Sequence, residues 1–222
     1  MNISILDIET LAQPEYVIRA KIPAFRPEKV ALGNAKKPET VAEIIETARL
    51  NHGNDIVAKA ALYPEYGQVA IAGFYDGSTV HQFCLEGMDE REIISEALAE
   101  VVSAIQGSQG VLGWNVLSFD MMFLVKRAWI LGVKVPSIIF NPLRPRYPWC
   151  DKIIDLMEVY KAGVYRDSFT VLDNACKALG IEGKSGTGKQ FAELWETDVQ
   201  SALSYNADDL RKTMLVAERL IG

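Results

Sequence analysis

Acidic residues stand at the ends of apolar segments at widely separated places in this chain, and this pattern limits the folds that it can adopt. Asp7 and Glu9 close the first apolar segment, Asp120 follows another, and Asp209 comes four residues after Tyr205. A carboxylate in apolar surroundings is costly unless it is paired or bound to a metal ion. We therefore expect a fold that brings these acids together as a divalent-metal centre.

The spacing of these residues indicates how they can converge. Side chains alternate between the two faces of a strand, so Asp7 and Glu9 share one face of the strand predicted at the start of the chain. Residues four apart share one face of a helix, so Tyr205 and Asp209 lie side by side on the predicted last helix. Asp120 falls in the first turn of a helix that directly follows a predicted strand.

Length and composition favour one large α/β domain over two small ones. The chain has 222 residues, 49% of them hydrophobic, which suffices for one sizeable core, so we expect a single domain over residues 1–222. Its net charge of −6 differs from that of general polyanion-binding proteins, which are usually basic. A local basic groove stays open, and an acidic metal site would itself contribute to the negative charge.

Further features of the composition indicate a soluble protein. Cys84, Cys150 and Cys176 are far apart, and without a C-x-x-C pair they predict neither a zinc site nor a disulfide framework. Three lone cysteines fit a reducing compartment. The first residues lack the basic start and long apolar run of a signal peptide, and no apolar stretch approaches membrane-spanning length. We expect a cytoplasmic protein with no membrane partner.

The order of predicted elements indicates a mixed sheet with helices on its faces. Asp76-Gly77 is a strong hairpin signal, and Asp89 with Glu92 forms a capping box at a helix start. Ser118 is expected to cap the helix that carries Asp120. The hairpin is antiparallel, and the later strand–helix units favour parallel pairing. The predicted strands are 2–8, 68–75, 78–85 and 110–114, and the predicted helices are 40–50, 89–105, 119–131, 151–160, 168–179, 190–196 and 198–220.

Two segments are expected at the surface. Residues 13–39 are rich in basic side chains and are repeatedly broken by prolines, so we expect a mobile surface excursion there. Lys126 and Arg127 are expected on a solvated face of their helix.

Taken together and in this order, the acidic segments resemble the three motifs of the DEDD superfamily of 3′–5′ exonucleases. Asp7-Ile8-Glu9 is similar to D-x-E on the first strand, residues 115–120 are similar to N-x-x-x-F-D, and residues 205–209 are similar to Y-x-x-x-D on the C-terminal helix. The last spacing favours Asp209 over its neighbour Asp208. The tyrosine points to the DEDDy branch, like the proofreading domains of family B DNA polymerases.

The resemblance runs from about residue 3 to about residue 215. It implies an RNase H-like α/β fold, with a five-stranded mixed sheet flanked by helices. No polymerase domain would fit in the remaining residues, so we expect a stand-alone exonuclease.

The resemblance also implies a role for each site residue. Asp7, Glu9 and Asp209 would hold a first Mg²⁺ or Mn²⁺ ion, while Asp7 and Asp120 would hold a second. Two such ions about 4 Å apart can activate a water and stabilise the leaving oxygen. Tyr205 would orient the attacking water and the scissile phosphate, with the metal as the source of hydroxide because a free tyrosine has a pKa of about 10.

Substrate contacts are implied in the same way. Thr10 and Leu11 resemble the family's contacts to the terminal nucleotide, and Asn115 and Phe119 would lie near the second nucleotide. Asp155 has two open interpretations: it either supports the metal ligands from behind or is an acid buried on a helix.

One segment invites a competing interpretation. Residues 183–190 nearly match the P-loop pattern, but Gln190 replaces the serine or threonine that ligates magnesium, and a helix end rather than a strand precedes the segment. We therefore expect no ATP partner and a flexible loop, whose lysines can still contact a phosphate. The basic and aromatic segment 140–152 is either a nucleic-acid contact or a loop stiffened by prolines.

Two hypotheses for function follow. The first is a metal-dependent exonuclease that releases nucleoside 5′-monophosphates from the 3′ end of a nucleic acid, with single-stranded DNA favoured over RNA. The alternative is a catalytically silent nucleic-acid-binding module on the same fold. The presence of all four carboxylates and the tyrosine favours the enzyme.

Overall fold

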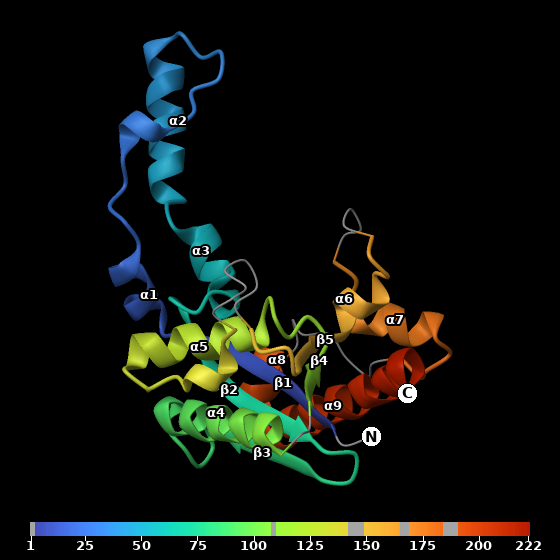
Figure 1. Ribbon diagram of the computed structural model, residues 1–222. Coiled ribbons are helices and arrows are strands. Elements are labelled where there is room, and N and C mark those ends of the chain that lie inside the picture. Colours follow the sequence, from blue (N-terminus) through green and yellow to red (C-terminus); the bar gives the residue numbers. More distant parts are fainter. Residues whose placement is uncertain (1–2, 108–109, 142–148, 165–168, 184–190) are drawn as a thin grey trace. The chain divides into compact units, whose positions relative to one another are not determined.

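The computed structural model describes residues 3–107, 110–141, 149–164, 169–183 and 191–222 (Figure 1). The chain divides into two compact units. The core unit consists of Met1–Leu11 and Val69–Gly222, and the inserted unit consists of Ala12–Gln68. That both units act together as one exonuclease domain stays a prediction.

A five-stranded mixed sheet forms the centre of the core unit, as expected. Its strand order is β3-β2-β1-β4-β5. Strands β2 and β3 pair antiparallel, whereas β1 pairs with β4, and β4 with β5, in parallel. The strands are β1 (Ile3–Ala12), β2 (Gly67–Tyr75), β3 (Val80–Cys84), β4 (Gly110–Gly113) and β5 (Ile153–Asp155).

The central strand β1 is buried on both faces over its first half. Leu6 and Ile8 pack into one hydrophobic core, and Ile3 and Ile5 pack into another on the opposite face. Strands that are covered on both faces need such a continuous apolar run. The first run of apolar residues therefore places β1 at the centre of the sheet.

Helices cover both faces of the sheet (Figure 1). The core that contains Leu6 and Ile8 also contains residues of α4 and α5, and the core that contains Ile3 and Ile5 also contains residues of α6, α7 and α9. A third cluster joins β2 to α8 and α9. These helices are α4 (Glu90–Gln106), α5 (Asp120–Leu131), α6 (Leu156–Tyr160), α7 (Leu172–Ala178), α8 (Phe191–Thr197) and α9 (Val199–Ile221).

Of the residues predicted to begin or end helices, the capping pair of α4 and the glycine that ends α5 are confirmed, and the serine expected to cap α5 is not. The capping box of α4 is confirmed: the Glu92 backbone N–H donates to the Asp89 side chain at 2.9 Å, and the Asp89 N–H donates to Glu92 at 2.8 Å. The expected cap by Ser118 is wrong, because Phe119 holds the N-cap position of α5 and makes no capping side-chain hydrogen bond. Gly132 ends α5 at a φ of 70°, as its position predicted.

The helix predicted for residues 151–160 is wrong in its first half. Residues Ile153–Asp155 form the edge strand β5, and α6 begins only at Leu156. Ile153 lies opposite Val111 of β4. So short a strand is stabilised by pairing with a distant segment, and local periodicity does not reveal this.

The solvated helix face expected at Arg127 is also wrong. Arg127 is 3% exposed and forms a two-point ion pair with Glu90 of α4, in which Nε lies 2.8 Å from Oε1. The same Oε1 accepts the backbone N–H of Val69 at 2.8 Å. This pair joins α4, α5 and β2, and a buried charge of this kind needs such partners.

The inserted unit is built from short helices. The expected excursion at residues 13–39 contains α1, η1 and the first residues of α2, and its mobility stays a prediction. Few side chains are buried in this unit; Ile18 and Ala60 are among them. Its helices are α1 (Glu15–Lys21), η1 (Pro27–Lys29), α2 (Pro38–Leu50), α3 (Asn54–Ala58) and η2 (Ala60–Leu62). Across the parts of both units that are described, no helix is long and apolar enough to cross a bilayer.

Candidate metal centre

One face of β1 changes from apolar to acidic along the strand. Ile3 and Ile5 pack with residues of α9, and the next two side chains on the same face are Asp7 and Glu9. Leu11 follows and packs against the hydrophobic cluster that includes Tyr205 of α9. The alternation of the strand thus directs both carboxylates toward α9, and both are half-buried.

The last helix supplies the third carboxylate. Carboxylate oxygens of Asp7, Glu9 and Asp209 all lie within 4.8 Å of one another, and Asp209 is 3% exposed. The neighbouring Asp208 forms an ion pair with Lys212, at 2.5 Å between its Oδ2 and the lysine Nζ. The two adjacent acids of α9 therefore lie in different surroundings, and Asp209 is the one beside β1.

Asp120 lies against the backbone of β1 and is not one of the three clustered acids. It is 3% exposed, and its Oδ1 accepts the backbone N–H of Ile8 at 2.8 Å. Ile8 stands between Asp7 and Glu9 in the strand. Burial, and secondly the charge of Asp7, raise the pKa of the Asp120 carboxyl well above its usual range. A cation nearby would favour its ionised form.

Tyr205 stands beside the carboxylates as a neutral hydroxyl. Burial raises the pKa of Tyr205, and the charges of Asp209, Glu9 and Asp7 raise it further. A hydrogen bond with Asp209 acts in the same direction. A hydroxyl that keeps its proton can donate a hydrogen bond, and it is a poor general base.

Asp155 supports the turn that leads to Asp120. Its Oδ1 accepts the backbone N–H groups of Asn115 at 3.0 Å and of Met157 at 2.9 Å, and its Oδ2 accepts that of Leu117 at 3.2 Å. Burial raises the pKa of Asp155, against these backbone hydrogen bonds. Asp155 is thus a buried acid at the end of β5 and the N-cap of α6, and it holds the segment before Asp120; its support of metal ligands stays a prediction.

The other candidate contacts lie close to these residues in sequence and fold. Thr10 and Leu11 follow Glu9 in β1 and are half-buried. Asn115 has a φ of 62° at the turn after β4, and the ring of Phe119 packs 5.7 Å from that of Phe123. Contact of these four residues with a substrate stays a prediction.

Two segments singled out in the sequence lie largely outside the described residues. Residues 184–190 of the near-P-loop and residues 142–148 of the basic and aromatic segment belong to the parts that are not described. On either side of residues 142–148, Phe140 and Trp149 form a β-bridge, and their ring centroids are 6.0 Å apart.

Sequence reasoning missed an amide that contacts Asp7. Asn206 of α9 is fully buried, and its Nδ2 donates to Asp7 Oδ2 at 2.8 Å. Its Oδ1 accepts from Gln82 Nε2 at 2.9 Å. Gln82 Nε2 also donates to the carbonyl oxygen of Leu203 at 2.9 Å. Because a carbonyl only accepts, this last contact fixes the Gln82 amide and, through it, directs the Asn206 NH₂ toward Asp7.

The contact between Gln82 and Asn206 needs space at β2, and Gly73 provides it. A Cβ atom at Gly73 would lie 2.1 Å from Asn206 Oδ1. A signal existed in the sequence, since asparagine is unfavourable inside a helix unless its side chain has a specific partner. The identity of that partner could be seen only in the fold.

Comparison with known proteins identifies a family for the larger part of the chain. The profile of one family, described as predicted 3′–5′ exonucleases related to the exonuclease domain of PolB, matches residues 68–220. The chain belongs to this family of PolB-related exonucleases. The matched part includes Asp120, Tyr205 and Asp209, and it begins near the end of the inserted unit.

A solved structure shares the fold of this chain. The family B DNA polymerase from the hyperthermophilic archaeon Pyrobaculum calidifontis superposes with a TM-score of 0.57 at 17% sequence identity, over 99% of this chain and 24% of the polymerase chain. The chain thus spans about a quarter of the polymerase. The likeness confirms the expected RNase H-like fold. No curated protein sequence matches the chain.

Proposed function

We propose that the chain is a metal-dependent 3′–5′ exonuclease that hydrolyses phosphodiester bonds at the 3′ end of a nucleic acid, with single-stranded DNA as the favoured substrate. The observation that carries this proposal is the convergence of Asp7, Glu9 and Asp209 beside Tyr205, in a member of a PolB-related exonuclease family. The structural likeness to a DNA polymerase supports DNA as the substrate.

The acidic cluster fits divalent ions that prefer oxygen ligands. Three carboxylates whose oxygens lie within 4.8 Å of one another repel each other unless a cation is shared among them. Asp7, Glu9 and Asp209 would hold one Mg²⁺ or Mn²⁺ ion, and Asp7 with Asp120 would hold a second. Two such ions, when bound, supply an activated water and stabilise the charge on the leaving oxygen.

The remaining residues position these groups. Tyr205, as a neutral donor, orients the attacking water and a phosphate oxygen. The backbone N–H of Ile8 orients Asp120, and the amide of Asn206 orients Asp7. Such hydrogen bonds reduce the freedom of ligand side chains, and ligand geometry is therefore set before the ion binds.

The proposal is tested with single-stranded DNA labelled at either end. We expect products shortened one nucleotide at a time from the 3′ end in Mg²⁺ or Mn²⁺, with mononucleotide release from a 3′-labelled strand, and no products in EDTA. Strand binding without cleavage in either metal would instead establish the silent binding module. A matched RNA strand measures the preference for DNA.

Loss of the Asn206 amide is expected to weaken metal binding without removing a ligand. We predict that Asn206→Leu lowers Mn²⁺ affinity by about 10- to 100-fold, because residues that orient metal ligands typically contribute this much. Gln82→Met is expected to act in the same direction with a smaller effect, and the double variant to lose little more than Asn206→Leu, since both residues act through one chain of hydrogen bonds.

Calorimetric titration with Mn²⁺ provides the measurement, and activity of Asn206→Leu should recover at high Mn²⁺ concentration. Asn174→Leu, on the exposed side of α7, is the control and should bind Mn²⁺ normally. Wild-type Mn²⁺ affinity in a folded Asn206→Leu protein would show that the amide has no positioning role.

A further inference from the structure

Positive charge is concentrated in one segment of the inserted unit. The whole chain carries a net charge of −6, yet the stretch from Arg19 to Lys37 holds only one acidic residue, Glu28. Its basic residues are Arg19, Lys21, Arg26, Lys29, Lys36 and Lys37. A nucleic-acid strand is a polyanion, and a cluster of acids repels it at long range, so a basic segment elsewhere in the chain would favour its binding.

Several of these cations are already engaged within the unit. Arg19 pairs with Glu15 at 2.6 Å, and Lys21 Nζ donates to Gln13 at 2.7 Å and to the carbonyl oxygen of Glu65 at 2.9 Å. Within the described residues, no acidic side chain pairs with Arg26 or Lys29. Arg26 and Lys29 are therefore available to an external anion, as are the exposed Lys36 and Lys37, but only Arg26 and Lys29 line a described pocket.

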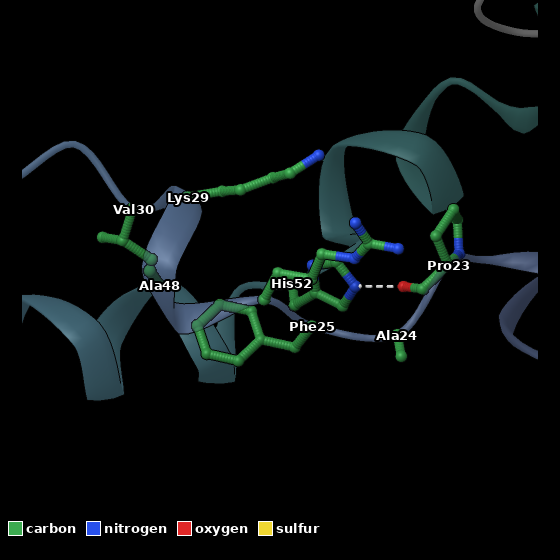
Figure 2. Close-up of a pocket in the computed structure, with 8 residues that line it drawn as sticks. Pro23, Ala24, Phe25, Lys29, Val30, Ala48 and His52 are labelled. Carbon is green, nitrogen blue, oxygen red and sulfur yellow. Dashed lines mark hydrogen bonds between the residues drawn. The ribbon is translucent and has the colours of Figure 1, made fainter.

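Arg26 and Lys29 line a pocket that also has an aromatic and apolar wall. The pocket has a volume of about 580 Å³ and lies entirely within the inserted unit. Figure 2 shows the Lys29 side chain along one side and the rings of Phe25 and His52 on the other. Val30 and Ala48 add apolar surface. A volume of this order suits a small organic ligand.

Hydrogen bonding and ring packing hold the aromatic wall in place. His52 Nε2 lies 2.7 Å from the carbonyl oxygen of Pro23, drawn as the dashed line in Figure 2. The rings of Phe25 and His52 meet edge to face, with centroids 5.4 Å apart. Phe25 is half-buried and Arg26 is exposed, so the ring is anchored while the next side chain is available to solvent.

We propose that this pocket binds one nucleotide of a single-stranded nucleic acid, as a second contact that retains the strand whose 3′ end enters the metal centre. The proposal rests on the proposed exonuclease function. A nucleotide unit combines a planar base with a phosphate, and the pocket combines an aromatic wall with two available cations. Stacking on aromatic rings and neutralisation of phosphates by arginine and lysine are two common ways in which proteins bind unpaired strands.

Binding of a strand tests this proposal separately from cleavage. The full chain is titrated in EDTA against fluorescein-labelled oligothymidylate, and fluorescence anisotropy reports the Kd. We expect Arg26→Ala/Lys29→Ala to weaken binding by about tenfold and to reduce the salt dependence of log K by about 1, and Phe25→Ala to weaken binding by about tenfold.

The control is Lys36→Ala/Lys37→Ala, which removes two cations of the same segment that do not line the pocket. It should change the Kd by less than about twofold to threefold. If the pocket variants bind like this control, the pocket does not hold the strand. Competition by polyglutamate as effective as that by unlabelled oligothymidylate would also overturn the proposal, because it would indicate a site for anions in general.

Cleavage of a long strand at two substrate concentrations distinguishes this proposal from the proposed function. Because the pocket is proposed to bind the strand and not to take part in the chemistry, the pocket variants should cleave a saturating long strand at the wild-type rate and degrade it more slowly at low substrate concentration. If the wild-type protein does not cleave the strand but the pocket variants still lose affinity, the exonuclease assignment fails and the pocket stands. Normal cleavage by the wild-type protein with unchanged affinity in the variants would overturn the pocket proposal and leave the exonuclease assignment standing.

Discussion

Asp209→Asn is expected to lower the rate of 3′-end cleavage by about a thousandfold or more, whereas Asp208→Asn leaves it within about twofold to threefold of wild type. Asparagine keeps the shape of the side chain but removes the charge from the cluster with Asp7 and Glu9. Metal ions contribute several kcal/mol of transition-state stabilisation, and about 1.4 kcal/mol corresponds to a factor of ten in rate.

Asp208→Asn is a matched control for Asp209→Asn, because it makes the same chemical change at the adjacent residue of the same helix. Asp208 pairs with Lys212 on the same helix and is not one of the three clustered acids, so its replacement leaves the charge of that cluster unchanged. Single-turnover cleavage of end-labelled DNA in saturating Mn²⁺ gives the rates, and calorimetric titration gives the metal affinities. Equal losses in the two variants, or normal cleavage by Asp209→Asn, would contradict the assignment of Asp209 as a metal ligand.

Tyr205→Phe is expected to slow cleavage by about a hundredfold while changing Mn²⁺ affinity by less than about twofold. Removal of one well-placed hydrogen-bond donor in an active site typically has an effect of this order. The ring stays, so its packing against Phe191 and within its hydrophobic cluster is preserved. Because burial raises the pKa of Tyr205, we expect the hydroxyl to keep its proton as the pH rises through the usual range of a tyrosine, so that its contribution persists there.

The measurement is the ratio of wild-type to variant rate as a function of pH. This ratio should stay constant between neutral pH and the highest pH at which the protein is folded. Tyr75→Phe is the control, since the Tyr75 hydroxyl donates to the carbonyl oxygen of Gly77 in the hairpin and is exposed. A large loss of Mn²⁺ affinity in Tyr205→Phe would show that the tyrosine organises the ligands instead of orienting the reactants.

Some parts of the fold followed from local patterns and others did not. The hairpin at Asp76-Gly77 and the α4 capping box rest on interactions between residues close in sequence, and the central strand is marked by its own continuous apolar run. Strand β5 depends on pairing with β4, and the burial of Arg127 depends on Glu90 of another helix. Strand β4 and Glu90 both lie far away in sequence, whereas periodicity and capping patterns relate only residues a few positions apart.

The candidate site divides in the same way. The period of a strand directs Asp7 and Glu9 to one face, and the period of a helix places Tyr205 beside Asp209. Asn206 follows Tyr205 directly, and no spacing rule connects it with Asp7. Its contact arises because α9 crosses the sheet where Gly73 leaves space for the amide.

Which side chains can share a face thus depends only on the repeat of a strand or a helix, and these repeats can be recognised in the sequence. Which faces meet depends on the packing of distant elements: the acidic part of β1 meets the face of α9 that carries Asp209, while Asp208 is paired with Lys212. That packing also decides how the acids are held, since the backbone N–H of Ile8 and the amide of Asn206 reach Asp120 and Asp7 across long sequence separations. Buried polar groups need hydrogen-bond partners, and here these partners come from elements that are distant in sequence and meet only in the folded chain.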